Sequence, residues 1–87
     1  MSKAELLDQI VEATDGEALV MREYDDALMG LVRQAGGQLV ALYDYRTCVK
    51  LLVDEGLSHE EAEEHLQFNV VDAYVGPHTP AFFYGVK

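Results

Sequence analysis

The short stretch Gly56-Leu57-Ser58 constrains the fold most strongly, because it carries a helix stop followed at once by a helix start. Its glycine suits the left-handed residue that follows a helix, and its leucine supplies the apolar contact that accompanies such a stop. Ser58 and Glu61 have the spacing of a capping box, which opens a new helix. Asp44 is a suitable N-cap for the helix before the stop. We therefore predict one helix over residues 45–55 and a second helix that begins at Ser58.

The second of these helices is expected to have an apolar side and an acidic side. Its buried stripe, read at helical spacing, consists of Ala62, Leu66, Asn69, Val70 and Ala73. Glutamates crowd its first turns, where the helix dipole favours anions: Glu60, Glu61, Glu63 and Glu64. This helix is therefore expected to present a glutamate-rich face to solvent.

Residues 2–14 are predicted to form another helix, since a serine at the start and a glutamate three residues later again have capping-box spacing. Asp15-Gly16 supplies its stop. Residues 17–26 are expected to be mostly loop. The longer stretch from Leu19 to Gln34 allows both a helical and an extended interpretation, and the sequence does not decide between them.

Residues 27–34 and 38–43 are predicted to be the two arms of a β-hairpin. The glycine pair Gly36-Gly37 lies between the arms and supplies the positive φ that a tight turn needs. Gly30 favours a strand for the first arm, because glycine is unfavourable in a helix interior. A further strand is predicted over residues 80–86, where aromatic residues follow two prolines.

These elements predict an α+β fold in which a small antiparallel sheet, made of the β-hairpin and the C-terminal strand, packs with about three helices on one face. A chain of 87 residues fits a single domain spanning residues 1–87. Apolar residues make up 49% of the chain, which is typical of a globular protein. One cysteine, no secretory signal and no long apolar stretch favour a soluble cytoplasmic protein.

The charge balance is strongly acidic. Sixteen Asp and Glu residues stand against six Lys and Arg residues, so the net charge is -10. A field of this sign repels nucleic-acid phosphates and anionic membranes, so direct binding to either is not expected. The natural complement is a protein with a basic surface, or a basic groove that normally holds nucleic acid. A purely solubilising role for the acidity is an open alternative.

No group of residues predicts a catalytic, metal-binding or cofactor-binding site. The pairs His59 with Glu63 and Glu61 with His65 have the i, i+4 spacing that can hold a divalent metal, but a third ligand at a defined spacing is missing. The other reactive side chains have ordinary structural roles available, such as capping for an aspartate or burial for a cysteine. These side chains are Asp25, Asp26, Asp44, Cys48 and His78.

The aromatic residues of the last predicted strand raise the question of what covers them. Phe82 and Tyr84 are expected to face one way and Phe83 the other, because consecutive strand residues point to opposite faces. At least one large aromatic side chain then lies on the face away from the core, unless another element covers it. An exposed interface centre and a covering helix, such as the first one, are both compatible with the sequence.

Several motifs between residues 24 and 83 stand out: Tyr24-Asp25-Asp26-Ala27-Leu28-Met29-Gly30, Ala41-Leu42-Tyr43-Asp44-Tyr45 followed by Cys48, Gly56-Leu57-Ser58-His59-Glu60-Glu61-Ala62, Phe68-Asn69-Val70-Val71-Asp72-Ala73-Tyr74-Val75-Gly76 and Thr79-Pro80. Through these motifs the chain resembles a group of small proteins without assigned activity from bacteriophages and their bacterial hosts. The resemblance implies a small cytoplasmic protein of phage-type context. It carries over no functional residues.

Small size, acidity and this resemblance favour a non-enzymatic protein-interaction domain. One version is a phage-encoded inhibitor that mimics nucleic acid and occupies the basic groove of a host nuclease, polymerase or defence complex, as anti-CRISPR and anti-restriction proteins of similar charge do. Such binding should be salt-sensitive. The residues expected to contact the partner are Asp54, Glu55, Glu60, Glu61, Glu63, Glu64, Phe82 and Tyr84.

Two other functions fit the sequence less directly. A self-assembling structural or accessory protein would pair its C-terminal strand between subunits, and a homodimer would bury the surplus aromatic face and the exposed sheet edge. An enzyme or small-molecule binder would need a pocket between sheet and helices, with His65 or Asp44 turned inward.

Overall fold

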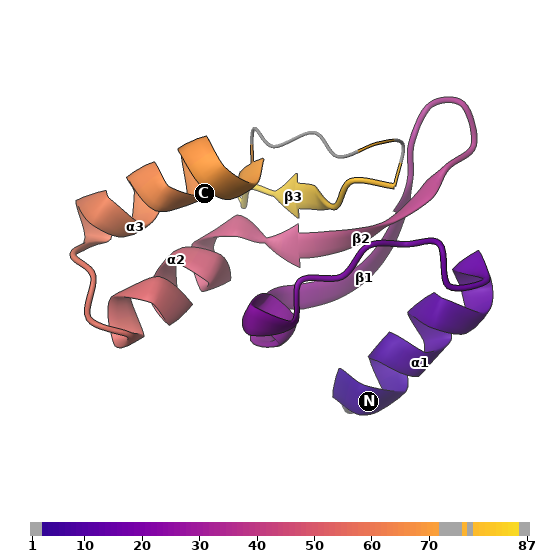
Figure 1. The fold of residues 1–87 in the computed structure, drawn as a ribbon, viewed down its shortest axis with the longest axis horizontal. Helices are drawn as coiled ribbons and strands as arrows, with labels where there is room; N and C mark the ends of the chain where they lie inside the picture. Colours follow the sequence, from indigo (N-terminus) through magenta and orange to yellow (C-terminus); the bar gives the residue numbers. More distant parts are fainter. Residues whose placement is uncertain (1–2, 72–75, 77, 86–87) are drawn as a thin grey trace.

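The computed structural model describes residues 3–71, 76 and 78–85. These residues form an α+β fold, as the sequence predicts (Figure 1). In chain order the elements are helix α1 (Lys3–Thr14), 3-10 helix η1 (Arg22–Ala27), strands β1 (Leu28–Arg33) and β2 (Leu39–Asp44), helices α2 (Tyr45–Asp54) and α3 (His59–Leu66), π-helix η2 (Gln67–Val71) and strand β3 (Ala81–Phe83). The expected cap at Ser2 lies outside the described residues.

The β-hairpin is confirmed. Strands β1 and β2 pair antiparallel, with Arg33 opposite Leu39 at the turn end. Gly36 and Gly37 have φ values of 95° and 94°, which non-glycine residues rarely adopt. The register shifts between Leu28 and Gly30, so this glycine belongs to a β-bulge and has a φ of 148°.

The prediction of an all-antiparallel sheet is wrong. The strand order is β1-β2-β3, and β3 pairs with β2 in parallel, with Leu42 opposite Ala81 and Asp44 opposite Phe83. The chain leaves β2 directly into α2 and returns only after α3, and a long helical crossover of this kind brings a strand back in the same direction. The sheet is therefore mixed.

Both predicted helices after β2 are confirmed, together with their caps. The Asp44 carboxylate accepts hydrogen bonds from the Thr47 amide at 3.2 Å and the Thr47 hydroxyl at 2.6 Å. The amide of Leu57 donates to the Leu52 carbonyl at 3.2 Å. Gly56 has a φ of 114°, so α2 ends in the left-handed stop that its sequence predicts.

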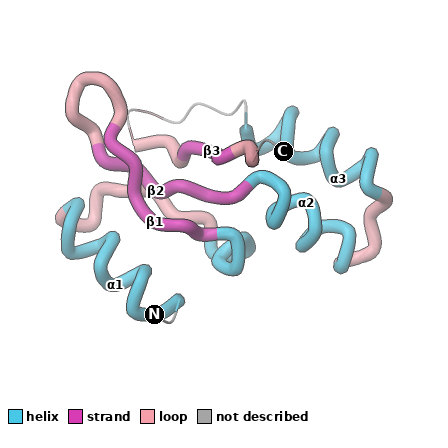
Figure 2. Tube along the Cα trace, turned by 180° about the vertical axis from the view of Figure 1, so that it is seen from behind, coloured by secondary structure: helices cyan, strands magenta, loops and turns pink. Residues whose placement is uncertain are grey.

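The helices do not all cover one face of the sheet. In Figure 1, α2 continues from the end of β2 and α3 lies beside α2, so the pair extends the molecule beyond one end of the sheet. Helix α1 lies beside β1, toward the opposite end, and the view from behind in Figure 2 shows the same separation. The two helical regions are therefore distinct surfaces.

The core joins these parts through a small set of buried side chains. The largest fully buried ones come from α1, β2, α2 and α3: Ile10, Val40, Tyr43, Cys48 and Leu66. Residues 22–26 were expected to be mostly loop and Ala27 to begin the first hairpin arm. Instead, residues 22–27 form two short 3-10 turns that meet at a kink at Tyr24, and both Tyr24 and Ala27 are buried. The stretch left open between helix and strand is therefore a 3-10 helix followed by strand β1.

The predicted apolar stripe of the last helix is only partly confirmed. Ala62 and Leu66 are fully buried, but Asn69 is exposed and Val70 half-buried. The cause is the change from α-helix to the wider π-helix after Leu66, which rotates the following side chains away from the expected face. The last residue of the predicted stripe, Ala73, lies outside the described residues.

Within the part of the chain that the structure describes, no helix combines the length and the apolar character needed to cross a bilayer.

Candidate protein-binding surface

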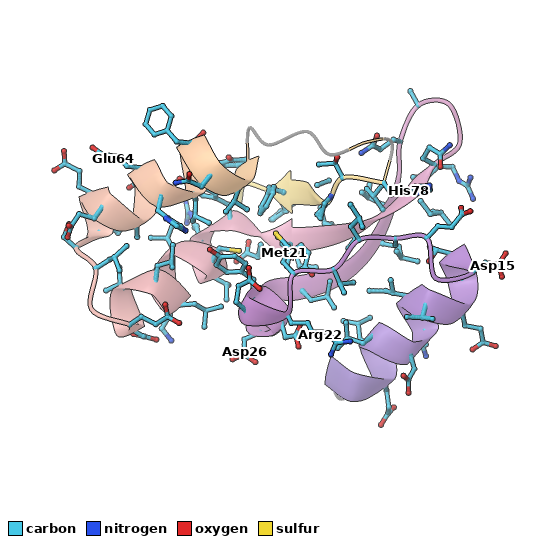
Figure 3. All side chains as sticks on the ribbon, in the orientation of Figure 1. Asp15, Met21, Arg22, Asp26, Glu64 and His78 are labelled. Atoms are coloured by element: carbon cyan, nitrogen blue, oxygen red, sulfur yellow. The ribbon has the colours of Figure 1, made fainter. Side chains whose placement is uncertain are left out.

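The glutamates of α3 line a shallow groove that runs along one side of the helical segment 59–68. Glu60, Glu63 and Glu64 form its sides together with His59, Gln67 and Phe68, and its volume is about 350 Å³. The Phe68 side chain is 78% exposed, which makes it the most exposed large apolar side chain of the described residues. Glu64 lies on the outer side of α3, away from α2 (Figure 3). We call this groove the acidic groove.

A second hollow adjoins the acidic groove and shares His59 and Glu63 with it. It has a volume of about 480 Å³ and lies between α2, α3 and the residues after β3. The other residues that line it are Tyr45, Arg46, Val49, Tyr84 and Gly85. We call it the tyrosine cleft, because two tyrosine rings form one of its walls.

The two rings of the tyrosine cleft are stacked. Tyr45 and Tyr84 have ring centroids 4.4 Å apart and ring planes inclined by 25°. The Gln67 side-chain amide donates hydrogen bonds to both hydroxyls, at 3.4 Å to Tyr45 and 3.5 Å to Tyr84. Tyr45 is buried, whereas Tyr84 is 47% exposed, so the inner ring supports the outer one. The outer tyrosine is thereby held in place while part of its ring remains in contact with solvent.

The side chains of His59 and Glu63 contact each other one helical turn apart on α3. The Nδ1 atom of His59 lies 2.8 Å from Oε1 of Glu63. Among the described residues, no group of three or more histidine, cysteine or acidic side chains is placed to hold a metal ion. His78 lies at the far end of the sheet from Glu64 (Figure 3), near Glu17, with 3.6 Å between its Nε2 and Oε2 of that glutamate.

Glu61 belongs to the same helix but has a structural role. Its carboxylate accepts a hydrogen bond from the Ser58 amide at 2.9 Å, and its own amide donates to the Ser58 hydroxyl at 3.1 Å. These bonds complete the predicted capping box. The backbone and hydroxyl groups of Ser58 lower the pKa of Glu61 below its ordinary value. Of the glutamates predicted to bind a partner, this one is already committed to the fold.

Asp54 and Glu55 are exposed at the C-terminal end of α2, and they line neither the acidic groove nor the tyrosine cleft. The structure therefore separates the eight predicted contact residues. Three glutamates and one tyrosine lie around the two hollows, and the α2 pair adds charge at the end of the helix.

Phe82 is not an exposed contact residue. It is half-buried, packs against the core, and its ring centroid lies 6.2 Å from that of Tyr43. The exposed side chain of β3 is Phe83, at 46%. Phe82 and Tyr84 thus lie in different surroundings, because β3 ends at Phe83 and the alternation of a strand does not extend to the following residue.

The remaining side chains considered as candidates for catalysis or metal binding lie outside the acidic groove and the tyrosine cleft. Cys48 is fully buried, and burial, followed by the charge of Asp44, raises the pKa of its thiol from 9.0 to about 12. Asp44 is occupied as an N-cap, and His65 is exposed. Asp26 is exposed, while one carboxylate oxygen of Asp25 is buried without a hydrogen-bond partner in the described structure.

Sequence reasoning missed Phe68, Tyr45 and Arg46 as parts of this surface. Phe68 gave a usable signal, since it lies off the predicted apolar stripe and so had to face outward if the helix continued. The contact between Tyr45 and Tyr84 gave no signal, because it depends on where the crossover returns the chain.

Comparisons of this chain with protein-family models, with curated proteins and with solved structures find no match. A function for the candidate surface is therefore argued from its geometry alone.

Proposed function

We propose that this protein is a non-enzymatic interaction domain that binds a basic partner protein through the acidic groove. The observation that carries the proposal is the exposed Phe68 beside the carboxylates of Glu60, Glu63 and Glu64. Protein interfaces place an aromatic anchor within a polar rim, and here the rim is acidic. A basic surface on the partner supplies the complementary charge. The net charge of -10 on this protein then raises the rate at which the two proteins associate.

The partner class that fits best is a nucleic-acid-handling protein, such as a nuclease, a polymerase or a defence complex. Its basic groove normally holds phosphates, and a row of carboxylates on one rigid helix offers a similar charge. The protein would then act as an inhibitor that excludes nucleic acid from the groove. A phage-encoded inhibitor acting in the host cytoplasm is the biological setting that the resemblance implies.

Self-assembly is the second candidate, since Phe83 and Tyr84 are also exposed. Charge argues against a homodimer built on the acidic groove. A two-fold symmetric dimer uses the same patch on both copies, so the carboxylates around Phe68 would face the same carboxylates of the second copy. Like charges opposed in this way are unfavourable. A monomer in light scattering at tens of micromolar would agree with the proposal, whereas a stable dimer lost on Phe83→Ala would favour self-assembly through strand β3.

The test is affinity capture from a host lysate, with proteins identified by mass spectrometry at low salt and at about 0.5 M salt, where the Debye length is only ~4 Å. We expect a basic, nucleic-acid-handling protein that is captured at low salt and lost at high salt. The purified partner should then lose its bound nucleic acid when this protein is added. Capture that is unchanged at high salt would contradict charge-based mimicry.

Matched variants locate the surface. The double variant Glu60→Gln/Glu64→Gln removes two charges from the acidic groove, and Asp8→Asn/Glu12→Gln removes two exposed charges from α1, which lies away from α3 (Figure 1). We expect the α3 variant to lose most of the capture and the α1 variant to keep it. Equal losses in both variants would mean that only the net charge matters, and the proposed surface would be wrong.

A further inference from the structure

The tyrosine cleft has a chemistry different from that of the acidic groove beside it. Tyr84 is 47% exposed and lines the cleft beside Tyr45, on which its ring is stacked with 4.4 Å between the ring centroids. The Glu63 carboxylate lines the same hollow, and His59 holds one of its oxygens at 2.8 Å. A planar surface and an oriented carboxylate therefore lie in one cleft of about 480 Å³.

We infer that the tyrosine cleft takes an arginine side chain of the basic partner. This inference rests on the proposed function and adds the group that the partner inserts. A guanidinium ion is planar, stacks on aromatic rings and donates several N–H groups in a fixed plane, so it can lie against Tyr84 and donate to Glu63 at once. A lysine ammonium is a compact, strongly hydrated charge that lacks the flat surface for stacking.

The pre-ordered ring favours this guest further. A tyrosine that is already stacked on a buried partner ring loses little conformational freedom when a ligand arrives. The net charge of -10 and the acidic groove next to the cleft supply the attraction that brings a cationic segment to this place. Aromatic stacking inside the cleft then decides which cation binds best.

Arg46 also lines the cleft, so changing it tests whether the guest carries a positive or a negative charge. Its side chain is exposed, and it has no ion-pair partner within the described residues. A positive charge at the rim repels a cationic guest and attracts an anionic one. Arg46→Gln should therefore tighten binding of an arginine side chain, and it would weaken binding of an anionic guest such as a phosphate or a carboxylate.

The experiment uses two peptides of equal charge, octa-arginine and octa-lysine, with the 87-residue chain at one low salt concentration. Calorimetry gives the Kd values, and NMR chemical shifts locate the bound peptide. We expect octa-arginine to bind about threefold or more tightly than octa-lysine, as a stacked guanidinium allows. The largest shifts should fall on Tyr84, Glu63 and Gln67.

Two neighbouring aromatic residues provide the matched variants. Tyr84→Leu removes the exposed ring of the cleft and should abolish the preference for arginine while binding of octa-lysine stays the same. Phe83→Leu changes an equally exposed ring that does not line the cleft, and it should leave the preference intact. Circular dichroism spectra that match the wild type confirm that both variants are folded.

The outcomes separate this inference from the proposed function. Equal Kd values for both peptides, weakened alike by Glu60→Gln/Glu64→Gln, would overturn the arginine site and leave the acidic groove supported. Weaker octa-arginine binding by Arg46→Gln would also overturn it. If neither peptide binds at low salt, the inference and the proposed function are both contradicted.

Discussion

The hydroxyl oxygen of Tyr43 accepts a hydrogen bond of 2.7 Å from the backbone amide of Met21, which lies 22 residues earlier in the chain. Tyr43 is fully buried in strand β2, and its ring also contacts Phe82 of β3. One side chain thus ties the extended segment before η1 to the centre of the sheet. Within the described residues this segment pairs with no strand, so the bond helps to hold it in place together with the packing of Val20 and Met21 against the core.

Removing this hydroxyl should destabilise the fold. Tyr43→Phe keeps the ring but leaves the Met21 amide without its acceptor, and we expect the free energy of unfolding to fall by about 1–2 kcal/mol. Urea denaturation at pH 7 measures the change. Tyr84→Phe is the control, because its hydroxyl is bonded only weakly, at 3.5 Å to Gln67. Similar stability of Tyr43→Phe and the wild type would show that water replaces the lost acceptor.

The Cys48 thiol should be inert in the folded protein. Full burial and a pKa of about 12 leave very little reactive thiolate at pH 8. We expect a thiol reagent such as dithionitrobenzoate to react with the unfolded protein in urea within minutes and with the folded protein only as fast as it unfolds. Rapid reaction of the folded protein would mean that this part of the core opens locally.

Stability should decline at alkaline pH. Burial raises the pKa values of Cys48, Tyr24 and Tyr43 in the folded protein, so the unfolded chain releases these protons first. The stabilisation is complete below the unfolded pKa of the thiol, near 9.0, and is lost between that value and about 12. Each group lowers the free energy of unfolding by about 1.4 kcal/mol per pH unit within its own window.

The variant Cys48→Ala isolates the contribution of the thiol to this decline. Its free energy of unfolding, measured in urea from pH 8 to pH 11, should fall less steeply than that of the wild type. The tyrosines keep the slope from vanishing, because both retain their raised pKa values. Parallel slopes in the variant and the wild type would mean that Cys48 does not titrate differently in the two states.

The Asp44 cap should contribute measurably to α2. Asp44→Ala removes the acceptor of two hydrogen bonds from Thr47 and should cost about 1–2 kcal/mol. Asp54→Ala is a matched control, because it removes the same charge from the other end of the helix, where an anion is unfavourable. Urea denaturation of both variants decides the point, and equal losses would contradict a capping role.

Local signals were sufficient for most of the elements. The caps of α2 and α3 each depend on residues three positions apart, and the hairpin depends on the glycine pair at its turn, so the sequence shows them directly. The direction of β3 depends on how two helices pack, which no local pattern reports. The 3-10 helix was missed for a related reason, since Tyr24 is held there by tertiary burial.

The candidate surface also has one part that local spacing predicts and another part that depends on tertiary packing. Glu60, Glu63 and Glu64 were predicted to be neighbours because helical spacing alone places them side by side. The stacking of Tyr45 on Tyr84 joins residues on either side of the crossover, so no sequence pattern indicates it. Phe82, expected to contact a partner, is half-buried against the core. Strand alternation says which residues share a face but not which face the core covers.

The parallel pairing of β2 with β3 has a kinetic consequence. Leu42 and Ala81 are separated by nearly half of the chain, whereas β1 and β2 meet through a short turn. Long loops close late because their entropy must be lost before their contacts form. We expect Val40→Ala to slow folding and Phe82→Ala mainly to speed unfolding in stopped-flow experiments. Tyr84 follows β3 directly, so we expect the tyrosine cleft to form late in folding and a nascent chain to acquire its binding surface only when it is otherwise native.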